Sequence, residues 1–191
     1  MTSSERIKWE AAHRGKPAGG EPEPFVAEMM PLLTRGGLVL DVAAGRGRNA
    51  IALARAGMHV VAADFSAVAM RALAQHARAE HLAIWPLLAD FDRFALRDRS
   101  FDAIIDVNFL DRALFSEFAR TLKPGGILLA ETFLIDQAQI GHPKDPRFLL
   151  KHYELRDLMG DLDLIRYREG LVAYPDGSRA WRAGAVARRK S

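Results

Sequence analysis

The chain has 191 residues and a formal net charge of +3, and 49% of its residues are hydrophobic while 27% are charged. This length and balance are typical of one globular domain with a substantial core, and they exclude a disordered chain. Cysteine is absent, which excludes disulfides, thiolate nucleophiles and cysteine-ligated zinc or iron–sulfur clusters, and no metal site is expected.

The chain is predicted to form a single domain, with a polar, Gly/Pro-rich arm over residues 1–22 and a core over residues 23–191. From Leu38 onward, short apolar runs alternate with helical patterns, which is typical of βαβ units and a mostly parallel sheet. Strands are predicted at 38–40, 59–63, 85–88, 101–106, 127–133, 164–169 and 180–187. Helices are predicted at 24–33 and 49–56, from the capping residue Ser66 to about 77, at 111–122 and around 155–159.

The last two predicted strands are joined by a turn at 175–177 and should pair in an antiparallel manner. The predicted fold class is therefore α/β, a Rossmann-like single domain with a doubly wound, seven-stranded, mostly parallel sheet and an antiparallel C-terminal strand. Residues 136–147 are polar and carry one glycine and two prolines. This composition predicts a long loop, and we expect it to act as a lid.

One glycine-rich segment, Asp-Val-Ala-Ala-Gly-Arg-Gly-Arg-Asn at 41–49, lies where the first strand meets the following helix. Gly45 and Gly47 allow a tight turn and a close approach of the backbone to a ligand, and the helix start offers unpaired N–H groups. Asp64 ends the second strand nineteen positions after Gly45, where its carboxylate can accept both hydroxyls of a ribose. Together these residues predict a nucleoside pocket.

The same residues admit two kinds of nucleotide cofactor. Gly45-x-Gly47-x-x-Ala50 followed by Asp64 also satisfies the dinucleotide fingerprint of NAD-binding folds. Asp41 favours a sulfonium ligand with an α-amino group, because a buried carboxylate is costly without partners. An NAD(P)-linked oxidoreductase remains an alternative, although no Tyr-x-x-x-Lys spacing is present. A catalytically silent S-adenosylmethionine-binding protein is a further alternative.

The glycine segment resembles motif I of the class I S-adenosylmethionine-dependent methyltransferases, with Ala43 in the place of the first glycine. Further resemblances follow in chain order, at Asp64, at 89–91, at 101–106 and at 122–126. The resemblance implies methyl transfer from S-adenosylmethionine. It also implies a set of cofactor-binding residues, which are Asp41, Ala43, Ala44, Gly45, Arg46, Gly47, Asn49, Asp64, Phe65, Ser66, Asp90, Phe91, Asp106 and Val107.

Within that superfamily, residues 45–49 and the tail from Tyr167 to Arg189 resemble the TehB-like tellurite-resistance and related small-molecule methyltransferases. A histidine that TehB proteins carry shortly before the turn at 175–177 has no match, since Ala173 and Tyr174 lie there. A tellurite-type activity is therefore left open.

Methyl transfer from a sulfonium is an in-line displacement, so the protein mainly positions the reactants and excludes water. No catalytic residue is assigned. If the nucleophile arrives protonated, the candidate bases are His13, His142, His152 and Tyr153. Fixed positive charge that could draw an anionic acceptor is carried by Arg46, Arg179 and Arg182.

The expected acceptor is a small molecule. Residues 106–109 lack the Asn/Asp-Pro-Pro-Tyr pattern typical of methylation at base amines or glutamine, and no basic stripe indicates nucleic acid. The N-terminal stretch is polar, and no apolar run reaches the roughly 18 residues that a membrane span needs. We therefore expect a cytoplasmic protein without nucleic-acid or membrane partners, while the oligomeric state is left open.

Overall fold

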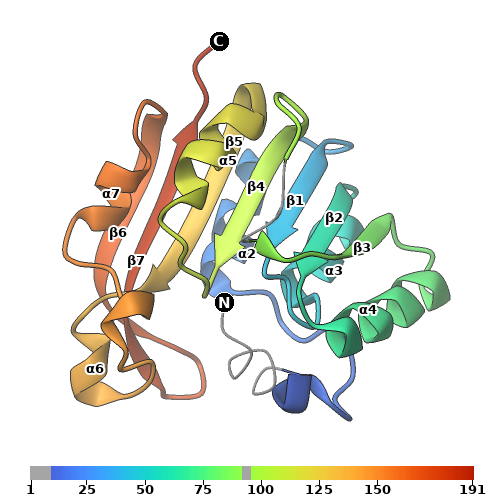
Figure 1. Cartoon of the computed structure of the whole chain (residues 1–191), viewed down its shortest axis with the longest axis horizontal. Helices are drawn as coiled ribbons and strands as arrows, with labels where there is room; N and C mark the ends of the chain where they lie inside the picture. The colour runs from blue at the N-terminus through green and yellow to red at the C-terminus, as the bar shows by residue number, and fades with distance from the viewer. Residues whose placement is uncertain (1–9, 92–95) are drawn as a thin grey trace.

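The computed structural model describes residues 10–91 and 96–191, and within them the chain folds around one seven-stranded sheet (Figure 1). The strand order is β3-β2-β1-β4-β5-β7-β6. β7 runs antiparallel to both β5 and β6, while the pairs among the other strands are parallel. This confirms the predicted fold class. The strands are β1 Leu38–Val42, β2 His59–Asp64, β3 Ile84–Leu88, β4 Phe101–Val107, β5 Leu122–Phe133, β6 Asp163–Ala173 and β7 Arg179–Arg188.

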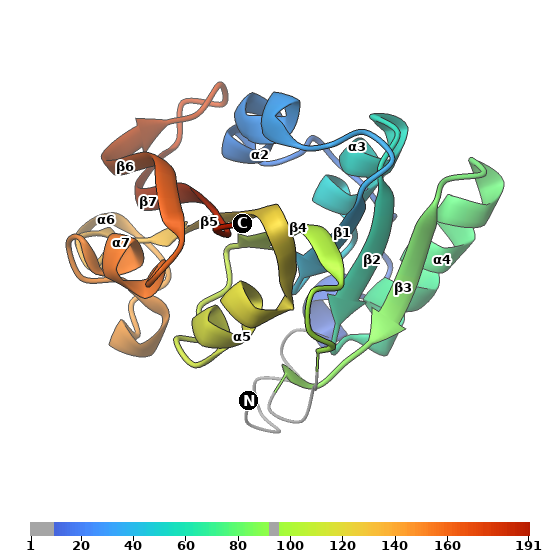
Figure 2. The same cartoon turned by 90° about the horizontal axis from the view of Figure 1, so that it is seen from above.

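Helices cover both faces of the sheet, as a doubly wound fold requires. Figure 2 shows α2, α3 and α4 on one face and α5 on the other, with α6 and α7 beside β6 and β7. The bounds are α2 Pro24–Met29, α3 Arg48–Arg55, α4 Ala67–Ala79, α5 Leu114–Thr121, α6 Gln137–Ile140 and α7 Glu154–Leu158, with short 3₁₀ helices at Met30–Leu32 and Pro146–Phe148.

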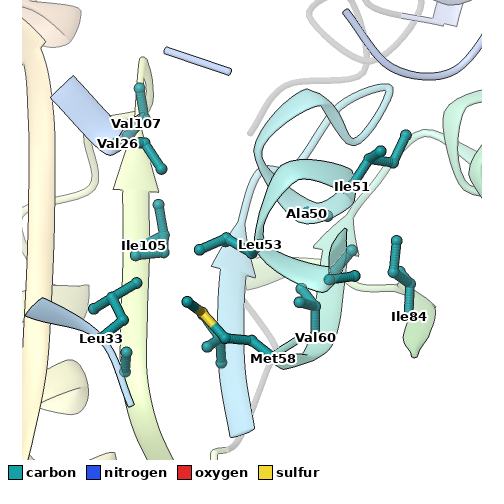
Figure 3. Close-up of a cluster of buried hydrophobic side chains, with 14 of the residues drawn as sticks. Val26, Leu33, Ala50, Ile51, Leu53, Met58, Val60, Ile84, Ile105 and Val107 are labelled. Atoms are coloured by element: carbon teal, nitrogen blue, oxygen red, sulfur yellow. The ribbon is translucent and has the colours of Figure 1, made fainter. Parts of the chain in front are cut away.

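The hydrophobic core lies in two layers, one on each side of the sheet. In β4, Ala103, Ile105 and Val107 belong to the layer under α2, α3 and α4, whereas Ile104 belongs to the opposite layer. Figure 3 shows part of the first layer, in which Ile105 and Val107 point the same way from β4. A central parallel strand is buried on both faces, which explains why its sequence is an almost continuous apolar run.

The capping role predicted for Ser66 is confirmed. Ser66 caps α4, because its Oγ accepts a hydrogen bond from the Ala69 N–H at 3.2 Å. Pro86 lies in β3, which is an edge strand of the sheet, where a missing N–H donor is tolerated.

Other expectations need correction. The segment 136–147 is not one continuous loop, because it contains α6 and the start of a 3₁₀ helix. The helix expected at 24–33 ends at Met29 and continues as a 3₁₀ turn, since Pro31 has no N–H for the α-helical ladder. The helix expected at 111–122 begins only at Leu114. The reason is a local turn in which the Asp111 carboxylate accepts the Ala113 N–H at 3.0 Å.

The start of β5 and the N-terminal arm also differ from expectation. The fifth strand was expected to start at residue 127, but β5 begins at Leu122, and residues 123–126 lie opposite a register shift between Phe101 and Ala103. The arm is helical at residues 10–13, and its residues 1–9 lie outside the described residues.

Candidate functional site

The glycine turn between β1 and α3 contains three residues in the left-handed region of backbone conformation. The φ angles are +50° at Ala43, +55° at Gly45 and +79° at Gly47. A Cβ on Gly47 would lie 2.4 Å from Leu73 Cδ1 in α4, so a side chain there would require the buried Leu73 to move. Gly47 is thus required by the packing of α4 against the turn, a role that the sequence pattern did not separate from ligand approach.

Asp64 is brought to the glycine turn as the sequence predicts. Its Oδ2 accepts the Gly45 N–H at 2.8 Å and its Oδ1 accepts the Ser66 N–H at 2.8 Å. Burial raises the pKa of the Asp64 carboxyl, and these two N–H groups act in the opposite direction. The carboxylate is therefore held rigidly at the end of β2, and each oxygen retains a lone pair for a further donor.

Two more carboxylates lie at the carboxyl ends of adjacent strands. Asp41 in β1 and Asp106 in β4 are each only 1% exposed. The Ala50 N–H reaches Asp41, yet within the described part of the chain Asp41 Oδ2 and Asp106 Oδ1 have no hydrogen-bond partner. Burial raises the pKa of Asp41 to about 7, and burial with the nearby Asp41 raises the pKa of Asp106 well above its usual value. A cationic group placed beside them would relieve this cost.

The remaining residues of the glycine turn serve mostly to hold it in place. The Ala44 N–H donates to the Ala63 carbonyl at 3.0 Å, which ties the turn to β2. Arg46 Nη1 donates to the Pro17 carbonyl at 2.7 Å. Asn49 is buried, and its Oδ1 accepts the N–H of Glu23 at 3.0 Å.

Four further cofactor-binding candidates divide into buried core residues and half-buried residues. Phe91 is buried and packs against Phe109 with ring centroids 5.4 Å apart, so it belongs to the core. Val107 is also a core residue. Phe65 is only half-buried at the end of β2, beside Asp64, and Asp90 is half-buried in the turn after β3. Of the two phenylalanines among the cofactor-binding candidates, Phe65 is therefore the one that is partly accessible.

A family model described as a methyltransferase domain matches residues 39–126, which include the glycine turn, Asp64 and Asp106. Residues 39–126, which are less than half of the chain, are thus similar to a methyltransferase domain. The chain is 33% identical over 157 residues to a demethylmenaquinone methyltransferase of Corynebacterium urealyticum, covering 78% of this chain and 63% of the relative. A demethylmenaquinone methyltransferase of Clavibacter sepedonicus is 41% identical over 98 residues, which is 46% of this chain and 38% of the relative. The chain thus spans less than two thirds of the length of either relative.

Several solved structures share the fold. TehB from Haemophilus influenzae superposes with a TM-score of 0.76 at 20% identity, covering 88% of this chain and 63% of that protein. A second structure is described under the conversion of a disulfide bond into a thioacetal group during echinomycin biosynthesis. It superposes with a TM-score of 0.76 at 21% identity, covering 97% of this chain and 93% of that protein. At these identities the likeness concerns the fold alone.

Of the four candidate bases, His13 reaches the glycine turn. Its Cε1 lies 3.5 Å from the position of a Cβ on Gly45, and burial lowers its pKa. His152 is exposed between Glu169 and Asp136, at 2.9 and 2.8 Å, and its pKa is raised chiefly by the bond to Glu169. Exposed positions are also taken by His142 and Tyr153.

The sequence analysis missed a buried group of charged residues beside the site, which we call the arginine–glutamate cluster. Arg182 in β7 is 2% exposed, and its Nη2 lies 3.1 Å from Glu131 Oε2 in β5. The other oxygen of Glu131 accepts from Arg168 Nη2 at 2.8 Å. Arg182 Nη1 donates to Asn108 Oδ1 at 2.5 Å, directly after β4. Glu23 lies 3.9 Å from Arg182 and completes the cluster.

The cluster corrects the expected role of the arginines on the last strand. Arg179 is exposed, but Arg182 is buried and paired with Glu131, so its charge is not available to draw an anionic acceptor. A signal was present in the sequence, because Glu131 and Arg182 each stand alone as a charge within an apolar strand. Two isolated opposite charges in predicted core strands indicate a buried pair.

Across residues 10–91 and 96–191, none of the helices has the length and apolar character needed to traverse a bilayer.

Proposed function

We propose that this chain transfers a methyl group from S-adenosylmethionine to a small-molecule acceptor by in-line displacement. The observation that carries the proposal is the pair of buried carboxylates, Asp41 and Asp106. Each has one oxygen near the glycine turn for which residues 10–91 and 96–191 provide no hydrogen-bond partner. S-adenosylmethionine carries a sulfonium and an α-ammonium group, and both are cationic. When bound, it supplies an electrophilic methyl group to the acceptor.

The same pair of carboxylates argues against a dinucleotide. An NAD(P) cofactor would place its pyrophosphate at the start of α3, next to the glycine turn. The charges of the pyrophosphate and of Asp41 have the same sign, and their repulsion would be strong in a buried site. The oxidoreductase alternative is therefore disfavoured on electrostatic grounds.

Each proposed cofactor contact follows from a position in the fold. Asp64 accepts the ribose hydroxyls with the lone pairs that Gly45 and Ser66 leave unused. Asp41 and Asp106 hold the cationic amino acid part, and the half-buried Phe65 contacts the adenine. The backbone of residues 43–47 lines the remaining side. These roles extend the methyltransferase-domain match to individual residues.

For the acceptor, the two relatives named demethylmenaquinone methyltransferases make a hydroxylated aromatic ring the first candidate. A base assists if the ring hydroxyl must lose its proton, and His13 is the candidate base that reaches the glycine turn. Tellurite and related oxyanions form the second class to test, because TehB shares the fold. The cytoplasmic location stays a prediction.

Two measurements test the proposal in sequence. Calorimetry with S-adenosylhomocysteine and with NADH, side by side, should give binding of the first and none of the second. Labelled S-adenosylmethionine is then supplied with reduced demethylmenaquinone, tellurite, thiols and simple phenols. Binding of NADH alone would sink the proposal, and binding of S-adenosylhomocysteine without any methyl transfer would support the silent binding protein instead.

Asp64→Ala provides the residue-level test. Loss of charge-assisted hydrogen bonds to the ribose should weaken S-adenosylhomocysteine binding by about 1.5–3 kcal/mol, which is roughly 10- to 150-fold. Asp161→Ala, at an exposed position, is the matched control and should bind as wild type does. An unchanged dissociation constant for a folded Asp64→Ala protein would remove the ribose role.

A further inference from the structure

The described part of the N-terminal arm, residues 10–20, lies over the glycine turn. The Gly19 N–H donates to the Arg46 carbonyl at 2.9 Å, and Arg46 Nη1 returns a bond to the Pro17 carbonyl at 2.7 Å. The His13 ring lies against Gly45. Figure 1 shows this part of the chain at the edge where the parallel strands end, next to α4. The arm therefore covers the place where we propose that the cofactor binds.

Glu10 anchors the start of the arm to α4. Its Oε1 accepts the Ala67 N–H at 2.8 Å, in the first turn of α4 and directly after the Asp64–Ser66 segment. Its Oε2 is buried from solvent and has no hydrogen-bond partner among the residues that the structure describes. A buried carboxylate oxygen without a donor is costly, so this oxygen suits a donor that a ligand brings.

The carboxylates of Glu10 and Asp64 lie close enough to interact electrostatically. Asp64 and Glu10 are close enough that the negative charge of Glu10 adds to the raised pKa of Asp64. Two carboxylates on one small site repel each other unless donors lie between them. A ribose carries two hydroxyl donors and an adenine carries an amino group, and these groups are the right chemistry to bridge both acids.

We propose that Glu10 is a second cofactor-binding carboxylate, which accepts a hydrogen bond from the adenosyl group and thereby closes residues 10–20 over the bound cofactor. This inference rests on the proposed function, because it takes the adenosyl group as the ligand. It differs from a role in which the arm fills the site and blocks it. A blocking segment would satisfy its own polar atoms, whereas Glu10 Oε2 is left for a ligand.

The first test measures binding of S-adenosylhomocysteine by calorimetry to wild type, Glu10→Gln, Glu21→Gln and Asp64→Ala. Glu21 is exposed on the same arm and serves as the matched control. Glu10→Gln replaces an acceptor by an amide donor and should weaken binding about tenfold or more, while Glu21→Gln should have no effect. If Glu10→Gln binds within about twofold of wild type while Asp64→Ala binds weakly, the inference is wrong and the proposed function stands. If wild type itself does not bind, both fail.

The second test follows the arm itself by limited trypsin digestion at the exposed Arg14–Gly15 bond. The fragment that begins at Gly15 is quantified by mass spectrometry with and without S-adenosylhomocysteine. The ligand should slow this cleavage several-fold in wild type and in Glu21→Gln but not in Glu10→Gln. Faster cleavage with ligand would mean that the cofactor displaces the arm, and it would overturn the inference even if Glu10→Gln lowered the affinity.

Discussion

Two regions at the carboxyl edge of the sheet bury carboxylates in opposite ways. Around the glycine turn, Asp41 and Asp106 are buried with raised pKa values and take part in no ion pair within the described ranges. In the arginine–glutamate cluster, Glu131 is equally buried but lies between Arg168 and Arg182. Burial of an acid is tolerated when its charge is compensated. The comparison indicates that compensation is internal in the cluster. At the turn, the Ala50 N–H and the charge of Arg48 act on Asp41 but leave its pKa raised, and we propose that a cationic ligand supplies the rest.

The largest expected effect comes from removing the Glu131 carboxylate from the arginine–glutamate cluster. Glu131→Ala leaves the fully buried Arg182 without its carboxylate and should lower the free energy of unfolding by about 3–5 kcal/mol. Urea unfolding followed by circular dichroism measures the loss. Glu28→Ala removes the exposed partner of Arg166 and Arg168 and should cost less than about 1 kcal/mol. Equal losses for the two variants would mean that the cluster is not compensated internally.

The uncompensated region should instead respond to pH. The pKa of Asp41 is raised from 3.8 to about 7, so between these values the folded protein keeps a proton that the unfolded chain releases. Stability therefore falls as pH rises through this window, by on the order of 4 kcal/mol, and levels off above about pH 7. Urea midpoints from about pH 5 to 8 should decline less in Asp41→Asn, which mimics the protonated side chain.

The exposed Asp161→Asn is the control for that pH series and should follow the wild-type profile. Parallel profiles for Asp41→Asn and wild type would contradict the raised pKa. They would also remove the main physical difference between the two regions.

The two regions also differ in how far the sequence predicted them. The glycine turn is local, since Gly45, Gly47 and Asp64 are fixed by one strand–helix–strand unit whose geometry follows from alternating patterns. The doubly wound, mostly parallel sheet and its antiparallel last strand were likewise predictable. The cluster was not, because the contact between Glu131 and Arg182 joins residues 51 positions apart and exists only once β5 and β7 are neighbours. The same holds for Glu10, whose partner Ala67 is 57 positions away.

A local sequence pattern does not show which neighbouring element requires a given residue. Gly47 is an example, because Leu73 of α4 packs against it. Gly47→Ala adds a Cβ 2.4 Å from Leu73 Cδ1 at a φ of +79°. We expect a loss of about 2–4 kcal/mol in unfolding free energy, from overpacking together with left-handed strain. Gly36→Ala has nearly the same φ, +77°, with no atom within 4 Å of the new Cβ, and should lose only about 1 kcal/mol. Thermal or urea unfolding of the pair isolates the packing contribution, and equal losses would show that α4 does not press on the turn.

The smallest expected change in stability comes from a substitution at Ala43, which lies within the glycine turn itself. This residue takes a φ of +50° as alanine, in the place where the related motif carries glycine. Ala43→Gly relieves left-handed strain of about 1–2 kcal/mol but adds freedom to the unfolded chain worth about 0.5–1 kcal/mol. A net stabilisation of roughly 0.5 kcal/mol should follow, measurable as a small rise in the urea midpoint. Ala119→Gly, within α5, is the opposite control and should lose about 1 kcal/mol. A loss of similar size in Ala43→Gly would mean that the turn draws rigidity from its alanine, and that the glycine region is held more firmly than its φ angles imply.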